Sequence, residues 1–148
     1  MMQIRAYCDD DFSALCRIFQ RAVREIASQH YSPAQINAWA QVDDACWRQK
    51  MADSLVLVAT VDETPVGFVT AVERYIDLLF VDPSYARQGV ASALLNALFA
   101  RVPTGALTVE SSITAKACFE RLGFVVLAEQ EVEARGETFV NYRMEKIR

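Results

Sequence analysis

The clearest chemical signal in the sequence is a loop that contains one glycine. The stretch "LLFVDPSYARQGVASALL", residues 78–95, runs from an apolar segment through an Asp-Pro break and Gly89 into a helical pattern. A strand, loop and helix in this order can bind a phosphate, because amides at a helix N-terminus lack intrahelical partners and carry the positive end of the dipole. Gly89 would let a phosphate approach the backbone, since it has no Cβ. The spacing equally allows a glycine that only eases a tight turn.

The distribution of glycines excludes the common nucleotide-binding loops. A Rossmann G-x-G-x-x-G motif or a P-loop needs several glycines close together. No two of the glycines here lie within ten residues of each other: Gly67, Gly89, Gly105, Gly123 and Gly136. A nucleotide-binding protein that uses this loop is therefore a disfavoured alternative.

Cysteine and histidine usage argues against a metal site. The four cysteines form no C-x-x-C pair, and His30 is the only histidine. A structural zinc site needs four such ligands, usually at short spacing. We expect no metal, and we expect the cysteines to be reduced thiols of a cytoplasmic protein.

Length and composition predict an ordinary soluble domain. The chain has 148 residues, 53% of them hydrophobic and 23% charged, which fits one domain over residues 1–148. A net charge of -4 gives no reason to expect a nucleic-acid partner, because such domains usually carry a basic face. No apolar run approaches the ~18 residues of a membrane span, and the N-terminus has no signal-peptide pattern.

Apolar periodicity predicts a mixed sheet around these features. Residues 12–27 repeat apolar side chains at three- and four-residue spacing, which is typical of an amphipathic helix, and Ser32 with Pro33 predicts the start of a second one. The other predicted elements are strands over 2–8, 54–62, 66–73, 75–81, 106–110, 125–133 and 137–147, helices over 87–101 and 111–123, further helical turns over 43–52, and a turn at 103–105. The order β-α-α-β-β-β-α-β-α-β-β predicts an α/β protein with an α+β mixed sheet and helices on its faces.

Two motifs resemble those of one enzyme family. "LLFVDPSYARQGVASALLNAL" resembles motif A of the GCN5-related N-acetyltransferases (GNATs), whose core is [QR]-x-x-G-x-[GA] after a strand that ends in V-x-P. "SITAKACFERLGF" resembles the following family motif, N-x-x-A-x-x-[FL]-Y-x-[KR]-x-G-F. The stretch "HYSPAQINAWA" is similar to the Y-S-P-x-Q-x-x-x-W segment of a group of small bacterial GNATs. The resemblance covers essentially the whole chain and implies the GNAT fold.

The resemblance implies that coenzyme A, carrying an acetyl group, is the cofactor. The loop amides would wrap its pyrophosphate, and the backbone of the preceding strand would bind the pantetheine arm as an added strand does. By position in the motifs, the resemblance assigns cofactor binding to the following residues: Leu79, Phe80, Val81, Arg87, Gln88, Gly89, Val90, Ala91, Ser92, Ser112 and Phe119.

Three positions depart from the family pattern. Ala86 stands where the motif has Gln or Arg, although Arg87 and Gln88 keep the polar character. Ser112 replaces the asparagine of the second motif, and capping the helix that follows is an equally good account of it. Phe119 replaces the tyrosine often proposed as general acid, which puts the catalytic acid in doubt.

The implied reaction needs a proton acceptor. An alkylamine with a pKa of roughly 10 is protonated at neutral pH and must lose a proton before it attacks a thioester. Asp77 is the first candidate, because its alternation along the strand matches Leu79 and Val81 and would point it toward the acetyl group. Glu110 is the second candidate for the base, and Tyr142 is a further catalytic candidate.

The resemblance implies that the helical segments after the first strand form part of the wall of the acceptor pocket. Tyr31, Trp39 and His30 are expected to line the acceptor pocket, and Glu73 is assigned to the same side, with a solvated turn residue as its alternative. Core packing for the tryptophans and a surface position for His30 remain open.

The resemblance therefore implies an N-acetyltransferase that moves acetyl from acetyl-CoA directly to a primary amine of a small molecule or a protein. The alternative is a catalytically impaired CoA-binding module with a regulatory or interaction role, which Phe119 supports. A homodimer is an open alternative to a monomer.

Overall fold

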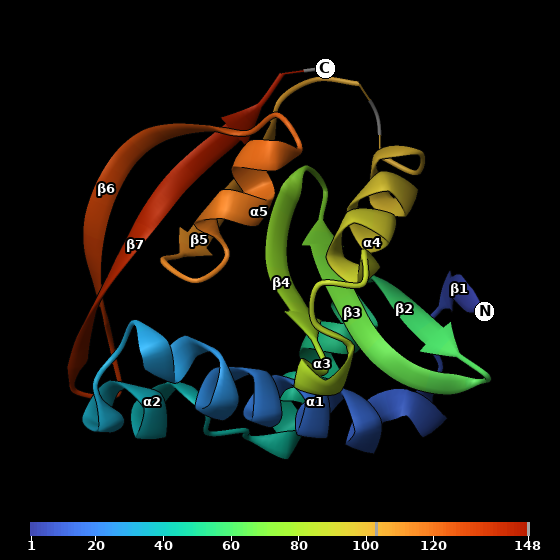
Figure 1. The fold of residues 1–148 in the computed structure, drawn as a ribbon, viewed down its shortest axis with the longest axis horizontal. Helices are drawn as coiled ribbons and strands as arrows, with labels where there is room; N and C mark the ends of the chain where they lie inside the picture. Colours follow the sequence, from blue (N-terminus) through green and yellow to red (C-terminus); the bar gives the residue numbers. More distant parts are fainter. Residues whose placement is uncertain (103, 148) are drawn as a thin grey trace.

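A seven-stranded mixed sheet forms the centre of the computed structural model, which describes residues 1–102 and 104–147 (Figure 1). The strand order is β1-β2-β3-β4-β5-β7-β6. The strands are β1 (Met2–Ala6), β2 (Leu55–Val61), β3 (Thr64–Val72), β4 (Tyr75–Val81), β5 (Leu107–Ser112), β6 (Val125–Ala134) and β7 (Glu137–Lys146). The helices are α1 (Phe12–Glu25), α2 (Pro33–Trp39), α3 (Asp44–Asp53), α4 (Val90–Phe99) and α5 (Lys116–Arg121).

The predicted order of elements is confirmed, with shifts at some boundaries. The helical turns expected over 43–52 form the full helix α3, and α4 begins at Val90 rather than at residue 87. The helix of the second motif begins only at Lys116, because β5 extends through Ser112. Part of the turn predicted at 103–105 falls on Pro103, which lies outside the described residues.

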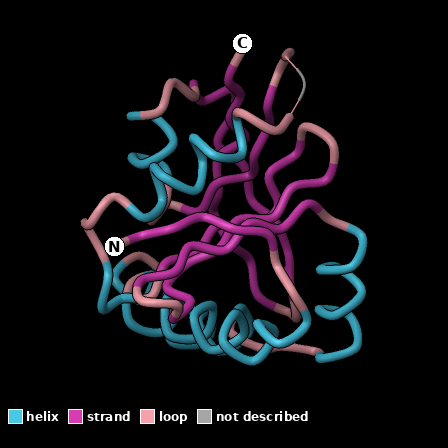
Figure 2. Tube along the Cα trace, turned by 90° about the vertical axis from the view of Figure 1, so that its right-hand side faces the viewer, coloured by secondary structure: helices cyan, strands magenta, loops and turns pink. Residues whose placement is uncertain are grey.

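Helices cover both faces of the sheet (Figure 2). One core layer lies under α1, α2 and α3, where Leu15, Ile18 and Phe19 are buried at the spacing that predicted the helix. A second layer lies under α4 and α5, where Leu94, Leu98 and Phe119 are buried. The sheet therefore carries an apolar layer on each side, as a helix-covered sheet requires.

The two halves of the sheet meet at a short parallel junction. Strands β1 to β4 form an antiparallel meander, and β5, β7 and β6 are also antiparallel to one another. Between them, β4 and β5 pair in parallel through only two residue pairs, Tyr75 with Thr108 and Ile76 with Val109. Beyond Ile76 the strands diverge (Figure 1), so the β4 edge has no partner strand from residue 77 onward.

A β-bulge in β4 interrupts the alternation of its side chains. Thr70 pairs with Leu78 and Ala71 pairs with Ile76, which leaves Asp77 as the extra residue. Ile76 and Leu79 pack in the layer of α4, whereas Leu78 packs in the layer of α1. The prediction that the Asp77 side chain alternates in step with Leu79 was therefore wrong, because the bulge breaks the two-residue period between them.

Gly67 lets the start of α4 approach the sheet. A Cβ at this position would lie 2.8 Å from Val90 Cγ1 and 3.1 Å from the Phe80 carbonyl oxygen. These distances are too short for a side chain, so only glycine allows this contact between β3 and α4. The N-terminus of α4 is thereby held beside the open part of β4.

A nearly buried carboxylate fixes the first strand to the turn that follows it. Both Asp11 oxygens accept hydrogen bonds from the Arg5 guanidinium, at 2.7 and 2.8 Å, and Oδ2 also accepts one from the Cys8 amide at 3.0 Å. The Arg5 hydrogen bonds lower the pKa of Asp11, although burial opposes them.

We expect Asp11→Asn to destabilise the protein at pH 7 by about 2 kcal/mol, the usual scale for hydrogen bonds to charged groups. Because folding lowers the pKa of Asp11, its stabilising contribution is present above the unfolded-state pKa of about 4 and is lost as the pH falls through the folded-state value. The difference in unfolding free energy between wild type and variant should therefore shrink in acid. Urea unfolding from pH 3 to 7 measures it, with the exposed Asp10→Asn as control; a difference that does not change with pH would contradict the assignment.

Candidate active site

A cavity of about 270 Å³ lies beside the glycine-containing loop, and we call it the loop cavity. It is bounded by the open part of β4, the loop at 82–89, the first turn of α4, and α5. Arg87 and Arg121 line it, and among the described residues no acidic side chain does. The lining is therefore suited to an anionic ligand.

The loop is held in place from both ends. Asp82 Oδ1 accepts hydrogen bonds from Arg21 Nη1 of α1 at 2.7 Å and from the Ser84 amide at 2.9 Å. The backbone then turns through left-handed conformations at Arg87, with φ +62°, and at Gly89, with φ +81°. These contacts fix the loop against α1 and direct the chain into α4.

The first turn of α4 presents backbone amides to the loop cavity. Val90, Ala91 and Ser92 line the cavity, and the first intrahelical bond across this turn is donated by Ala93 to the Gly89 carbonyl at 3.0 Å. The three preceding amides lack intrahelical acceptors and lie at the positive end of the helix dipole. Together with two arginines they form a site suited to a phosphate group.

Most of the predicted cofactor residues lie around the loop cavity. The members that line it are Leu79, Phe80, Val81, Arg87, Gly89, Val90, Ala91, Ser92 and Ser112. Gln88 is exposed and does not line it, and Phe119 lies in the wall of the other cavity described below. Arg121 was overlooked, although it occupies the [KR] position of the second motif and could have been found from it.

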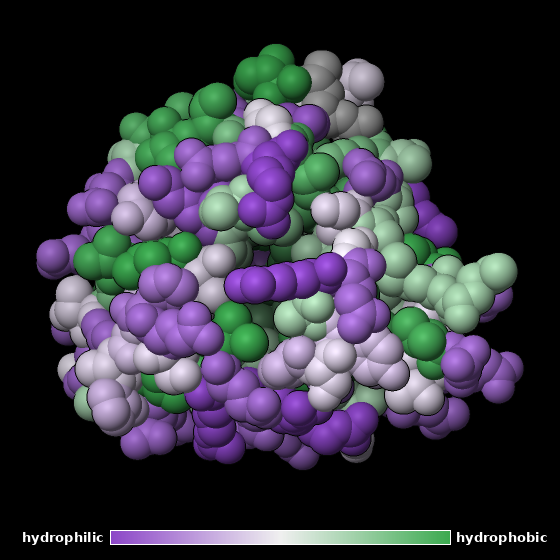
Figure 3. All heavy atoms as spheres, viewed as in Figure 1, coloured by the Kyte–Doolittle hydropathy of each residue, from purple (hydrophilic) through white to green (hydrophobic). Residues whose placement is uncertain are grey.

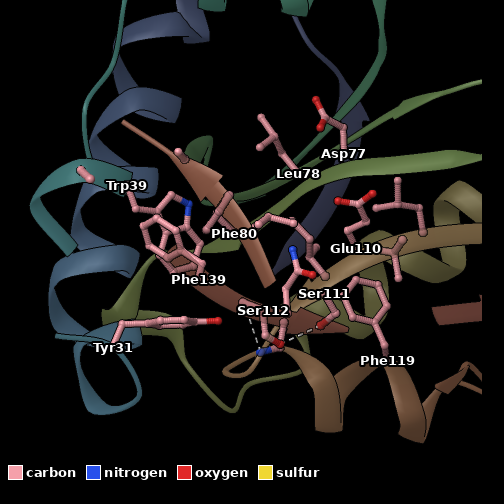
Figure 4. Close-up of a pocket in the computed structure, with 18 of the residues that line it drawn as sticks. Tyr31, Trp39, Asp77, Leu78, Phe80, Glu110, Ser111, Ser112, Phe119 and Phe139 are labelled. Carbon is pink, nitrogen blue, oxygen red and sulfur yellow. Dashed lines mark hydrogen bonds between the residues drawn. The ribbon is translucent and has the colours of Figure 1, made fainter. Parts of the chain in front are cut away.

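A second cavity, also of about 270 Å³, lies on the other side of the β4 edge, and we call it the aromatic cavity (Figure 4). Figure 4 shows the rings of Trp39, Phe80 and Phe139 gathered on one side, with Glu110 and Phe119 on the other. The face viewed in Figure 3 is hollowed near its centre, over the divergence of β4 and β5. Five residues line both cavities, so that one wall separates them: Trp39, Leu79, Phe80, Ser112 and Ala115.

Two carboxylates line the aromatic cavity, and their surroundings differ. Asp77 Oδ2 accepts a hydrogen bond from Lys50 Nζ of α3 at 2.6 Å, forming an ion pair. Glu110 is exposed on β5 and forms no ion pair among the described residues. Burial, followed by the charges of Glu110 and Asp77, raises the pKa of the neighbouring Tyr75 to about 12, which keeps that phenol protonated. Nothing in the sequence around Lys50 indicated its ion pair with Asp77.

Tyr31 lines the aromatic cavity, and its hydroxyl has two backbone partners. It donates to the Val140 carbonyl of β7 at 2.8 Å and accepts from the Ile113 amide at 3.0 Å. Burial raises the pKa of this phenol. Because its proton is already donated, Tyr31 serves as a structural link between α2, β7 and the start of the second motif. Trp39 also lines the aromatic cavity.

Three predicted side chains lie outside the aromatic cavity. Tyr142 faces α5, where Lys116 Nζ is 4.7 Å from its ring centroid, because its neighbour Asn141 occupies the cavity side of β7. His30 Nδ1 is 3.0 Å from Thr114 Oγ1 at the surface. Glu73 is exposed in the turn between β3 and β4, with φ +54°. The placement expected for Tyr142 was therefore wrong, since strand alternation turns it away from the cavity. His30 and Glu73 occupy the surface and turn positions that the sequence had left open as their alternatives.

The described residues contain no group of three or more potential metal ligands close enough to hold an ion. No helix within residues 1–102 and 104–147 has the length and apolar character that crossing a bilayer demands.

Comparison with known proteins identifies the family. A family model described as an acetyltransferase (GNAT) domain matches residues 27–146. The chain belongs to the GNAT family. The uncharacterized N-acetyltransferase YafP of Escherichia coli (strain K12) is 54% identical to it over 143 residues, covering 97% of this chain and 94% of that protein.

Solved structures of other GNAT proteins have the same fold. A GCN5-related N-acetyltransferase from Rhodopseudomonas palustris superposes with a TM-score of 0.95 at 30% identity, covering 99% of this chain and 95% of that one. The PaiA N-acetyltransferase of Thermoplasma acidophilum, solved in complex with coenzyme A, has a TM-score of 0.79 at 16% identity, covering 100% of this chain and 99% of that one. The predicted family, mixed-sheet fold and acetyl-CoA dependence are confirmed, and the chain is a GNAT N-acetyltransferase.

We expect Gly89→Glu to weaken coenzyme A binding at least about tenfold without unfolding the protein. Nothing lies within 4 Å of the added Cβ, so the side chain has room, but it brings negative charge to the phosphate side of the loop cavity. The matched control is Gly136→Glu, since Gly136 has φ +82° and open space and therefore imposes the same backbone strain far from the loop. Calorimetric titration with coenzyme A measures both; equal losses in the two variants would remove the loop from the binding site.

Proposed function

We propose that this GNAT enzyme transfers acetyl from acetyl-CoA directly to a primary amine, with the cofactor in the loop cavity and the amine in the aromatic cavity. The observation that carries the proposal is the wall that the two cavities share. Reactants bound on its two sides would meet across Leu79 and Phe80, where β4 has lost its partner strand. Holding two reactants next to each other accelerates a bimolecular step.

The loop cavity supplies matching contacts for coenzyme A. The α4 amides, Arg87 and Arg121 would hold its phosphates, and the unpaired edge of β4 would bind the pantetheine arm through backbone hydrogen bonds. When bound, acetyl-CoA supplies the activated thioester.

Glu110 is the better candidate for the base that receives the amine proton. Asp77 is held at 2.6 Å by Lys50, so accepting a proton there would disrupt an ion pair. Glu110 forms no such pair among the described residues and lines the same cavity. The sequence had favoured Asp77 over Glu110 as the base, and this preference is now reversed. The reason is the ion pair of Asp77 with Lys50 of α3, which the sequence did not indicate.

Ser112 is the hydroxyl placed best to assist the leaving thiol. Ser112 lines both cavities. Its hydroxyl oxygen accepts a hydrogen bond from the Ala115 amide at 3.1 Å, and this bond orients the hydroxyl. The proton of Tyr31 is donated elsewhere, and Phe119 has none to give. A thiol of pKa about 8.5 also leaves without a strong acid, so a serine or solvent is sufficient.

The function is tested by incubating the protein with acetyl-CoA and primary amines while free thiol is followed and the product mass is measured. We expect at least one amine to accelerate thiol release and to gain one acetyl group. Tight coenzyme A binding without any amine-dependent thiol release would instead favour the regulatory CoA-binding module.

We expect Glu110→Gln to lower kcat/KM by about a hundredfold, the lower end of the range for general-base catalysis. The additional decline in rate toward acid pH, beyond the one caused by protonation of the amine itself, should also disappear. Asp77→Asn should lower kcat/KM less and should keep that decline. A pH–rate profile of both variants decides the roles, and an Asp77→Asn effect larger than that of Glu110→Gln would reverse the assignment.

A further inference from the structure

The tip of the β6–β7 hairpin is bonded to the helical segment that carries α2. Gln35 Nε2 donates to the Thr138 carbonyl at 2.6 Å. Arg135 Nη1 donates to the carbonyls of Ala38 and Gln41 at 3.1 and 3.3 Å. Figure 1 shows the hairpin curving down to α2. We call these bonds, together with that of Tyr31 to Val140, the hairpin clamp.

The hairpin clamp closes one side of the aromatic cavity. Ala134 and Arg135 at the hairpin tip line the cavity together with Ala38 and Trp39 of α2. Because these two elements are joined by hydrogen bonds, no open groove runs between them. An extended peptide needs such a groove or a free strand edge along which to bind. The cavity is open to solvent on the side of the carboxylates, where Glu110 is exposed.

The interior of the aromatic cavity is a box of rings. The Tyr31 ring centroid is 5.5 Å from that of Trp39 and 5.8 Å from that of Phe139. Trp39 is in turn 6.2 Å from Phe80 and 6.3 Å from Phe139. The volume of about 270 Å³ is near the lower end of ligand sites, which begin at roughly 300 Å³. A compact apolar body fills such a box, whereas the thin unbranched stem of lysine does not.

Two hydrogen-bond acceptors in the aromatic cavity are available to a bound amine. Asn141 Oδ1 is buried and has no hydrogen-bond partner within the described part of the chain. Glu110 is unpaired there, whereas Asp77 is neutralised by Lys50. Arg135, the arginine in the lining, already donates from Nη1 to two carbonyls. The carboxylate side of the cavity, where Glu110 is the unpaired charge, is therefore suited to an N–H donor with one positive charge, whereas Arg135 places its own positive charge at the hairpin tip.

We propose that the acceptor is a compact primary amine with an apolar body and a single positive charge, free in solution, rather than a lysine side chain or the N-terminus of a polypeptide. The inference rests on the proposed function, since it assumes that the acceptor occupies the aromatic cavity. Asn141 is its specificity-determining residue, because a bound N–H group satisfies the buried oxygen that otherwise lacks a partner.

The first experiment compares acceptors by amine-dependent thiol release. The probes are cyclohexylmethylamine, putrescine, glutamate and a twelve-residue peptide with one central lysine and a blocked N-terminus. We expect kcat/KM for cyclohexylmethylamine to exceed that of each other probe at least about tenfold, the discrimination that small differences in a pocket provide. A peptide or putrescine that reacts as well or better overturns this inference and leaves the proposed function intact. If no amine of any kind accelerates thiol release, the proposed function itself fails.

The second experiment tests Asn141 with two variants. Asn141→Leu should raise KM for cyclohexylmethylamine about tenfold while the affinity for coenzyme A is unchanged. Asn141→Asp retains an acceptor oxygen and should raise KM less than Asn141→Leu does. Equal KM values for wild type and Asn141→Leu would remove Asn141 from acceptor recognition.

The third experiment releases the hairpin clamp with the double variant Gln35→Ala, Arg135→Ala. We expect the preference for cyclohexylmethylamine over the lysine peptide to fall at least about tenfold. The exposed Arg143→Ala on β7 is the control, and thermal unfolding verifies that both proteins fold. An unchanged preference in a folded double variant would show that the clamp does not set the acceptor class.

Discussion

The divergence of β4 from β5 after only two parallel residue pairs is the constraint on which the site depends. A sheet that continued its pairing would leave no space at its centre, and every backbone group of β4 would be satisfied by a neighbour. Where the pairing stops, the β4 edge presents unsatisfied backbone groups, and two cavities open on either side of it. The cofactor edge, the shared wall and the acceptor pocket are consequences of this one interruption.

Local features then fix what surrounds the divergence. Gly67 allows α4 to start directly beside the open edge, which brings helix amides to the loop cavity. The extra residue at the Asp77 bulge shifts the alternation of the side chains that follow it in β4. As a result, Phe80 packs with the rings under α1 and α2, while Leu79 packs under α4. Tyr31 joins the wall of the acceptor side to the start of the second motif.

The parts of the site that were predictable are those that depend on local sequence. A helix N-terminus after a single glycine presents amides in nearly any context, so Gly89 and its neighbours could be placed from the motif alone. The direction of the Asp77 side chain could not be predicted. The bulge in β4 arises from its pairing with β3, and the sequence of β4 alone carries no sign of it. Lys50 is twenty-seven residues away in sequence, and only the packing of α3 brings it to Asp77. Tyr142 was misplaced because the register of the last strand decides which of two adjacent residues faces the cavity.

The ion pair between Arg21 and Asp82 has a thermodynamic consequence for ligand binding. It holds the loop in its turned conformation, at an N–O distance of 2.7 Å. A loop that is ordered in advance loses little conformational entropy when a ligand arrives, so more of the contact energy appears as affinity. The charges of Arg87 and Arg121, which line the same cavity, add an electrostatic attraction that raises the association rate of an anionic ligand.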